Sequence, residues 1–383
     1  MNICNLSEYV LLDIFKYCNG KDLDNLYFTC DLFGRIIEQH IYLIKCKSVL
    51  ICGQDCFKER NFTRLTHRER LVINRNRLQN IWERHPVVPA RDYTKISLDK
   101  NFLYQSYKQY IRFYERGNNI IERPYTQEIC DPSGTTITDF KIKGDSIFAG
   151  QVSGEAVIYK NGNSKKQLLH RTSSITSVDF LDPIYVTGSC YSCKLWSLNL
   201  ECNLDHLKLI REYNLPCKTV CMSSSGHVFC GKDTDLENQA LVEIELETGK
   251  QRILNSNTTL VNDIKLKDEN VLFTANMCDI RIFDRRLNAD QVRFPLDLCT
   301  CLPTDCLEYD GYNGILCNNG RIGQISLFDL RVPSKEVVCH KISKYVQSIA
   351  CDSRYLFFAS ERDVEVLDFL ICDRFPLDLL YVK

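Results

Sequence analysis

Hydrophobic and polar positions repeat along most of the chain in units of about 42 residues. Each unit opens with a segment of alternating apolar and polar residues, continues with a short apolar run, and closes on an aromatic or aliphatic residue. The closing residue is Tyr114 in the first unit and Leu367 in the seventh, so six intervals span 367 minus 114, or 253, residues. Alternation predicts half-buried strands and an apolar run predicts a strand buried on both faces. Since a four-stranded propeller blade has this period, we predict a mainly β chain with a seven-bladed β-propeller over residues 93–383.

The alternating segments are predicted to be the first strand of each blade. They are Thr94–Leu98, Ile137–Ile142, Ile175–Phe180, Thr219–Ser223, Val261–Leu266, Asp305–Tyr309 and Val346–Cys351. Most of the apolar runs that follow end in a small residue such as Gly150, Gly188 or Gly231, which we expect to permit a tight turn into the third strand. The closings that contain Trp196, Asp284, Asp329 and Asp368 resemble those of the WD-repeat family, although most of that family's signature dipeptides are missing.

A propeller ring has to close, because an open blade edge would pair with other chains. The last unit needs an outer strand, and two segments are candidates: the tail Phe375–Val382, or a segment before the first blade such as Leu71–Asn74. We favour the earlier segment, because closure by it would lock both ends of the chain together.

Residues 7–44 follow a helical period instead. Leu11, Ile14, Phe15 and Cys18 fall at i, i+3, i+4 and i+7, and two similar sets follow. Ser7 is predicted to cap the first helix and Gly20 to end it, with Asp22 or Asp31 opening the next ones. Three helices in about 40 residues are too small to bury a core of their own, so we expect a partner to complete them.

The order of residues in this head is also specific. Leu6-Ser7-Glu8, Leu11-Leu12-Asp13-Ile14-Phe15, Lys21-Asp22-Leu23-Asp24-Asn25-Leu26 and Thr29-Cys30-Asp31-Leu32-Phe33 follow one another. This order resembles the F-box, with Ser7 where that family usually has proline. The resemblance implies that a Skp-type adaptor subunit is bound by Leu6, Leu11, Ile14, Phe15, Leu23 and Leu26. The alternative is that the helices pack on the propeller or on a linker helix.

Residues 47–92 are predicted to be a basic linker between the head, residues 1–46, and the propeller. From Lys58 to Arg84 the chain carries eight basic and three acidic residues, which we interpret as the solvated face of a helix whose apolar side holds Leu71, Leu78 and Trp82. Nuclear import or an acidic partner are other interpretations of this charge. The two prolines of the segment His85-Pro86-Val87-Val88-Pro89 are expected to break the helix and form a semi-rigid hinge.

Composition narrows the class of protein further. The net charge of −1 gives no overall basic field for nucleic acid or an anionic membrane, and no apolar stretch is long enough to span a bilayer. We expect a protein of the cytoplasm or nucleus, where its 21 cysteines are reduced and serve as small core residues. Cys190 and Cys193 have a metal-like spacing, but no second pair accompanies them, so neither a metal site nor a cofactor is predicted.

No catalytic constellation stands out in the chain. The segment Gly226–Asp233 is close to a phosphate-binding loop, yet it has Asp233 where a hydroxyl is needed and is predicted to form a strand. No Ser/His/Asp or Cys/His combination lies in a sequence motif typical of catalysis, so we do not expect an enzyme.

Together these features predict a substrate-recognition subunit of a Skp–cullin–F-box ubiquitin ligase, whose propeller binds a protein substrate. Two other classes stay open. The segments Phe283–Arg286 and Phe328–Arg331 resemble the endings by which WD-repeat receptors join a cullin-4-type ligase, although ordinary pairing of aspartate with arginine also explains them. A protein-interaction scaffold without a ubiquitin role is the third class.

In WD-repeat relatives that bind phosphorylated segments, arginines lie in the first strands and at the ends of the second strands, around the narrow mouth of the channel. The corresponding positions here are predicted to bind the substrate, and they are Lys95, Thr138, Gln151, Thr176, Lys232, Asn262 and Gln347. They form a polar mouth with few cations, which argues against strong recognition of phosphate.

Overall fold

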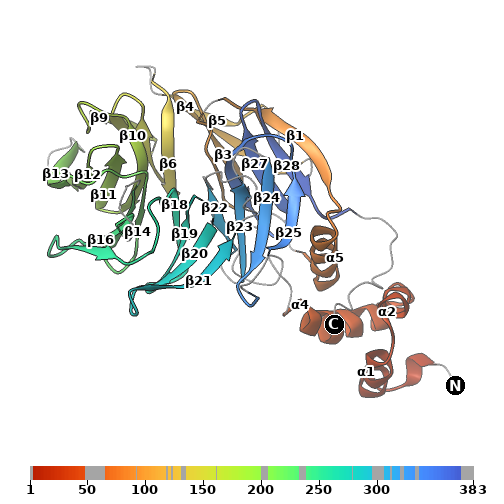
Figure 1. Ribbon diagram of the computed structural model, residues 1–383. Coiled ribbons are helices and arrows are strands. Elements are labelled where there is room, and N and C mark those ends of the chain that lie inside the picture. The colour runs from red at the N-terminus through yellow and green to blue at the C-terminus, as the bar shows by residue number, and fades with distance from the viewer. Residues whose placement is uncertain are drawn as a thin grey trace.

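The computed structural model describes residues 3–47, 65–91, 93–117, 120–121, 124–130, 135–160, 162–199, 206–232, 239–277, 279–295, 306–310, 313–319, 323–332 and 336–371. Seven four-stranded antiparallel sheets follow one another, which confirms the predicted seven-bladed propeller (Figure 1). Six blades use four consecutive strands. The seventh takes its outermost strand from the N-terminal side of the propeller.

From the innermost strand outward, the blades have the following strands. Blade one is β2 (Ile96–Leu98), β3 (Phe102–Tyr107), β4 (Tyr110–Glu115) and β5 (Gln127–Cys130); blade two is β6 (Ile137–Lys143), β7 (Ser146–Gln151), β8 (Glu155–Lys160) and β9 (Asn163–Leu168). Blade three is β10 (Ile175–Leu181), β11 (Ile184–Ser189), β12 (Cys193–Asn199) and β13 (His206–Tyr213); blade four is β14 (Thr219–Met222), β15 (His227–Gly231), β16 (Leu241–Glu245) and β17 (Gln251–Leu254). Blade five is β18 (Asp263–Leu266), β19 (Val271–Ala275), β20 (Asp279–Asp284) and β21 (Ala289–Pro295); blade six is β22 (Leu307–Tyr309), β23 (Gly314–Asn319), β24 (Gln324–Asp329) and β25 (Glu336–Lys341). Blade seven is β26 (Val346–Cys351), β27 (Tyr355–Ser360), β28 (Asp363–Asp368) and β1 (Glu83–Pro89).

The second strands form the core of the ring, as their apolar runs predict. Every residue of β7 and of β27 is buried, because neighbouring blades cover both faces of these strands. Packing explains the small residues at the strand ends better than the turn that we expected. A Cβ atom on Gly150 would lie 2.4 Å from Ile175 of the next blade, and one on Gly231 would lie 2.7 Å from Val261. These glycines therefore permit close approach of adjacent blades.

A hydrogen-bonded network in blade three joins β11 and β12 to His170, which lies in the connection from β9 to β10. Trp196 donates from Nε1 to Oγ1 of Thr187 over 2.9 Å, and Nε2 of His170 lies 2.8 Å from the same hydroxyl. All three side chains are buried. Burial together with the nearby charge of Lys194 lowers the pKa of His170 to about 4, so the imidazole is neutral.

The strand that closes the ring does come from the segment before the first blade, but it is not the one that we predicted. Leu71–Asn74 lies in the helix α5 (His67–Leu78), whereas β1 pairs with β28 from Glu83 opposite Asp368 to Pro89 opposite Asp363. The predicted hinge at residues 85–89 is therefore wrong. Prolines are tolerated here because β1 is an outermost strand, where a missing N–H does not interrupt a ladder. The alternative tail, Phe375–Val382, lies outside the described residues.

The N-terminal region is helical, as its period predicts. It comprises η1 (Ile3–Asn5), α1 (Glu8–Lys16) and α2 (Gly20–Tyr27), followed by the continuous α3 (Asp31–Ile36), η2 (Ile37–Tyr42) and α4 (Leu43–Cys46). Ser7 caps α1 as predicted. Gly20 does not end that helix but begins α2, where Asn19 is the cap and accepts from the backbone N–H of Asp22 over 2.8 Å. No helix in the described part of the chain is long and apolar enough to cross a membrane.

Helix α5 joins the head to the propeller (Figure 1). Thr66 and Glu69 form a reciprocal capping box that starts this helix. Toward the head, Arg68 binds the carboxylate of Asp24 through Nε and Nη2 over 2.7 and 3.1 Å. Toward the propeller, buried Arg77 donates to the carbonyls of Asp352 and Ser353 over 3.1 and 3.2 Å. The helix is therefore fixed at both of its faces by charged side chains.

This arrangement corrects our interpretation of the basic segment as a solvated face. Arg75 and Arg77 are 6% and 3% exposed, and one apolar core contains Tyr42 of the head, Leu71 of α5 and Phe358 of blade seven. Lys58, Arg60 and Arg64 lie outside the described residues. Arg68 and Arg77 thus attach α5 to the head and to the propeller, while Arg84 stays exposed on β1.

His340 of β25 lies at the contact between α5 and the propeller. Its Nδ1 is 2.7 Å from Oδ1 of Asn80, and its ring lies edge-on to Trp82. Burial, helped by the charge of Arg77, lowers the pKa of His340 to about 3. The imidazole is consequently neutral in the folded protein at neutral pH.

We predict that the two buried histidines make the protein less stable as pH falls below about 6.5. The unfolded chain binds protons on histidine near that value, whereas the folded protein does not until about pH 4 for His170 and 3 for His340. The unfolded state therefore binds more protons in this window, and each histidine lowers the free energy of unfolding by about 1.4 kcal/mol per pH unit. Urea unfolding of wild type and His340→Gln at pH 7, 6 and 5 measures the slope. The variant should lose about half of the slope of the free energy of unfolding against pH. An unchanged slope would contradict the assignment of this pH dependence to the buried histidines.

Candidate functional site

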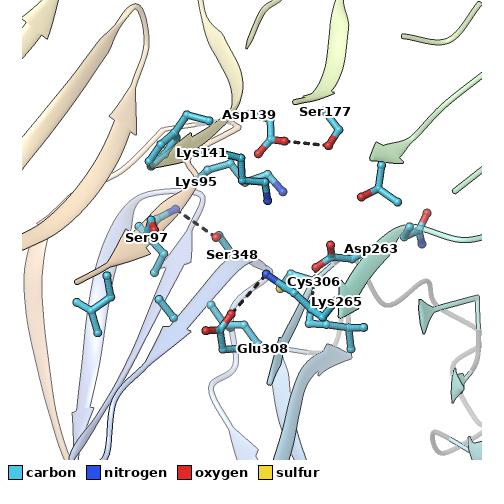
Figure 2. Close-up of a pocket in the computed structure, with 18 of the residues that line it drawn as sticks. Lys95, Ser97, Asp139, Lys141, Ser177, Asp263, Lys265, Cys306, Glu308 and Ser348 are labelled. Carbon is cyan, nitrogen blue, oxygen red and sulfur yellow. Dashed lines mark hydrogen bonds and ion pairs between the residues drawn. The ribbon is translucent and has the colours of Figure 1, made fainter. Parts of the chain in front are cut away.

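A cavity of about 240 Å³ lies where the first strands of all seven blades meet. Figure 2 shows its polar side chains, with Lys95, just before β2, and Lys141 of β6 pointing into it. The repeat predicts such a channel, because the innermost strands of a propeller surround its axis. The mouth of this channel is the first candidate site.

Three of the seven side chains predicted to bind substrate line this cavity, namely Lys95, Thr176 and Asn262. The start of the first strand is bulged in several blades, which places one extra residue at the mouth. Thr138, Thr176 and Gln347 are the extra residues of blades two, three and seven. These three predicted positions are therefore equivalent in their blades.

Most of these mouth residues are engaged in holding neighbouring blades together. Thr138 donates to the carbonyl of Ile175 over 2.6 Å, and Thr176 donates to that of Cys217 over 2.5 Å. The backbone N–H of Thr94 donates to the side-chain oxygen of Gln347 over 3.0 Å. Each of these bonds joins one blade to the next or to the segment that leads into it, so these side chains have a structural task.

The two predicted residues at the ends of second strands have different surroundings. Gln151 is fully buried and accepts from the hydroxyl of Thr135 over 2.8 Å, so it does not face a ligand. Lys232 is half-buried, and its backbone bonds to Ala240 and Val261. Of the two, only Lys232 has side-chain surface available to a partner.

A second layer of contacts between blades lies one residue deeper in the channel. The carboxylate of Asp139 accepts from the hydroxyl of Ser177 and from the N–H of Val178, both over 2.9 Å. Asp263 accepts from the N–H of Leu307 over 2.8 Å, completing the same contact between blades five and six. Sequence reasoning missed this layer, because the polar residue of an alternating strand does not reveal which backbone it will meet.

Several of the charges that line the channel are paired. Burial opposes the protonation of Lys141, but the carboxylates of Asp139, Asp179 and Asp263 outweigh it and raise the pKa of the lysine. Lys265 lies 3.5 Å from Glu308, whereas Lys218 donates to the side-chain oxygen of Asn262 over 3.4 Å. Since Lys141 and Lys265 already face carboxylates, the described channel offers a phosphate less positive charge than its lining lysines alone suggest.

The second candidate site is the exposed face of α1. Val10, Ile14 and Tyr17 lie on one side of this helix at i, i+4 and i+7, and they are 46%, 40% and 92% exposed. Tyr9, beside them, is 84% exposed. We call these four residues the α1 face. An exposed apolar cluster of this kind marks an interaction surface.

The residues predicted to bind the adaptor divide into two groups. Leu11, Phe15 and Leu23 are buried in the core of the head, while Leu6 and Leu26 are half-buried against that core. Only Ile14 belongs to the exposed α1 face. In this structure the buried residues shape the surface from beneath and do not offer contact area themselves.

The aspartate and arginine pairs at the blade ends form as ordinary blade chemistry predicts. Arg286 binds Asp284 through Nε and Nη2 over 3.1 and 2.7 Å, and Arg331 binds Asp329 over 2.9 and 2.8 Å. These contacts lower the pKa of Asp284 to about 2. Both arginines keep exposed side-chain surface, 66% for Arg286 and 40% for Arg331, so the pairing is consistent with ordinary blade chemistry and does not test a cullin-4-type partner.

Comparison with known proteins supports the fold but assigns no family. No protein-family model matches the chain, and no curated protein matches it. Among solved structures 1331 chains match, including the crystal structure of the computationally designed Ika8 protein, with 13% identity and a TM-score of 0.52. That match covers 75% of this chain and 98% of the Ika8 chain. At so low an identity the likeness shows the fold alone.

We predict that Asp139→Ala destabilises the protein by about 2–3 kcal/mol. It removes the acceptor of Ser177 and Val178 and leaves the buried donors without a partner. Lys95→Ala is the matched control, because this residue lines the same cavity, and it should change the free energy of unfolding by less than about 1 kcal/mol. Urea unfolding measures both values; equal effects would mean that Asp139 does not hold the blades.

Proposed function

We propose that the protein is the substrate-recognition subunit of a Skp–cullin–F-box ubiquitin ligase. In this proposal the head docks a Skp-type adaptor that is joined to a cullin scaffold, and the propeller holds a protein substrate. The observation that carries the proposal is the α1 face, an exposed apolar surface on a helical unit whose residue order resembles the F-box. The chain itself needs no catalytic residues for this role, because the other subunits supply the chemistry.

The attachment of the head to the propeller supports the proposal. A ligase adaptor has to hold its substrate at a constant reach from the catalytic module, since positioning contributes to the rate of transfer. Here α5 is fixed to the head by Arg68 and to blade seven by Arg77, with a shared apolar core between them. Rigidity therefore comes from this docked helix and not from the proline segment.

The channel mouth supports a protein substrate that is recognised through polar contacts. Lys95, Thr176 and Asn262 line the cavity, and Lys232, which directly follows β15, accepts from the backbone N–H of Val261, the residue before Asn262. The described mouth lacks a cluster of arginines that would clamp a phosphate. We therefore expect a substrate segment that binds without prior phosphorylation.

The other two classes of function have weaker support. A cullin-4-type receptor would use Arg286 and Arg331, but both arginines are paired with aspartates of their own strands. In blade seven Asp368 binds Arg354 instead, an arginine that lies between β26 and β27. A scaffold without a ubiquitin role explains the propeller, but it leaves the residue order of the head without a reason.

We predict that Ile14→Asp abolishes co-purification with a Skp-type subunit while the protein stays folded. Ile14 is 40% exposed, so a carboxylate there costs little in the free protein, but it would be buried without a partner in the complex. Leu287→Asp is the matched control, since it places the same charge at an exposed leucine between β20 and β21. Pulldown from cells, quantified by mass spectrometry, should show at least a tenfold loss for Ile14→Asp alone.

Other results of that pulldown would count against the proposal. Undiminished recovery of the Skp-type subunit with Ile14→Asp would remove the α1 face from the docking surface. Recovery of a cullin-4-type adaptor without a Skp-type subunit would favour the second class, and absence of any ligase subunit would favour a scaffold. Leu11→Asp is not an informative test, because Leu11 is fully buried and its loss would unfold the head.

A further inference from the structure

Three cysteine side chains that are distant in the sequence meet between blades three and four. Cys193 begins β12, Cys217 lies in the connection from blade three to blade four, and Cys230 lies in β15. Their three sulfur atoms are all within 4.8 Å of one another, and the sulfurs of Cys193 and Cys230 are 3.6 Å apart. The spacing in the sequence gives no sign of this cluster.

The backbone is shaped to bring the third cysteine close. A Cβ atom on Gly188 would lie 2.9 Å from Cβ of Cys217 and 3.1 Å from Cγ1 of Val220. Glycine at this position therefore lets the connection press against β11. The N–H of Cys217 donates to the carbonyl of Ser189 over 2.7 Å and fixes the segment there.

The surroundings of the three sulfurs are closed and mostly apolar, although the thiol of Cys217 also donates to the carbonyl of Leu215 over 3.1 Å. Cys193, Cys217 and Cys230 are 0%, 1% and 0% exposed. They belong to a core cluster with Leu195 and Val242, among other aliphatic side chains. Packing alone does not require cysteine at all three positions, because other small apolar residues would fill the same space.

We propose that Cys193, Cys217 and Cys230 form a binding site for a soft metal ion, and that the site takes a cuprous ion held by three sulfur ligands. Sulfurs around one such ion at about 2.3 Å lie about 4 Å apart, which agrees with the separations in the cluster. Thiolate sulfur is a soft ligand that suits Cu(I), zinc and iron–sulfur clusters, so the number of ligands has to decide between these ions.

Zinc fits the cluster less well. A structural zinc ion takes four ligands in a tetrahedron, and within the described residues the cluster contains only three histidine, cysteine or acidic ligands. The closed surroundings also leave little room for a water molecule as the fourth ligand. A three-coordinate ion is therefore expected.

Binding of copper would release protons from the cysteines and leave a negative charge on the site. Each cysteine that becomes a thiolate loses its S–H proton to solvent, and no electron is transferred because copper stays in the cuprous state. The remaining negative charge is offset in part by Lys232, which interacts electrostatically with Cys217. Because the ligands come from both blades, the ion would join blade three to blade four and stabilise the ring.

The test uses the full-length protein, purified under reducing and metal-free conditions and titrated with Cu(I) in the presence of a competing Cu(I) chelator. We expect one copper per chain, a rise in the melting temperature on loading, and an X-ray absorption spectrum with three sulfur neighbours at about 2.2–2.3 Å. The spectrum is measured on wild type, so it stays decisive even if variants fold poorly.

Single substitutions Cys193→Ala, Cys217→Ala and Cys230→Ala should each weaken Cu(I) binding at least tenfold. Cys351→Ala is the matched control, because Cys351 is fully buried in β26 on another blade and should leave binding unchanged. The proposal is overturned if wild type binds no copper against the chelator, if Cys351→Ala loses as much copper as the cluster variants, or if Zn(II) binds at least as tightly as Cu(I).

Discussion

The pairing of β1 with β28 is the constraint on which the rest of the structure depends. A propeller blade buries its apolar second strand only if a blade lies on each side, so a ring that is open at one point exposes a core face and a strand edge. Here the outermost strand of the last blade comes from residues that precede the first blade. Closure thereby ties together chain segments that are almost 300 residues apart, from Glu83 opposite Asp368 onward.

The same N-terminal segment that closes the ring also fixes the head. Helix α5 ends five residues before β1 begins, so the position of β1 in blade seven determines where α5 lies. Arg77 then reaches the carbonyls of Asp352 and Ser353, and Asn76 donates to the carbonyl of Phe369 over 2.8 Å. The α1 face and the channel mouth are held in one geometry as a result, which is what an adaptor between two partners requires.

The channel shows a division between residues that bind blades and residues that remain available to a ligand. Some side chains form hydrogen bonds with backbone groups of the next blade or of the segment that leads into it, namely those of Thr138, Gln347 and Asp139. Satisfying those buried groups is favourable because an unpaired donor or acceptor in the core costs about 1–3 kcal/mol. Lys95 and Lys232 are half-buried and keep side-chain surface outside these contacts.

The sequence by itself determined the seven-bladed ring, the helical head and the origin of the closing strand before the first blade. Period and alternation are local properties, and burying an alternating strand of this length against its neighbours leaves few other folds. Tertiary structure alone decided that His85–Pro89 is a strand, that Arg75 and Arg77 are buried, and that Leu11, Phe15 and Leu23 lie beneath the α1 face. It also decided that Cys193, Cys217 and Cys230 meet. Each of these outcomes depends on which distant segment packs against a residue. The local sequence of a strand or helix does not specify that tertiary contact.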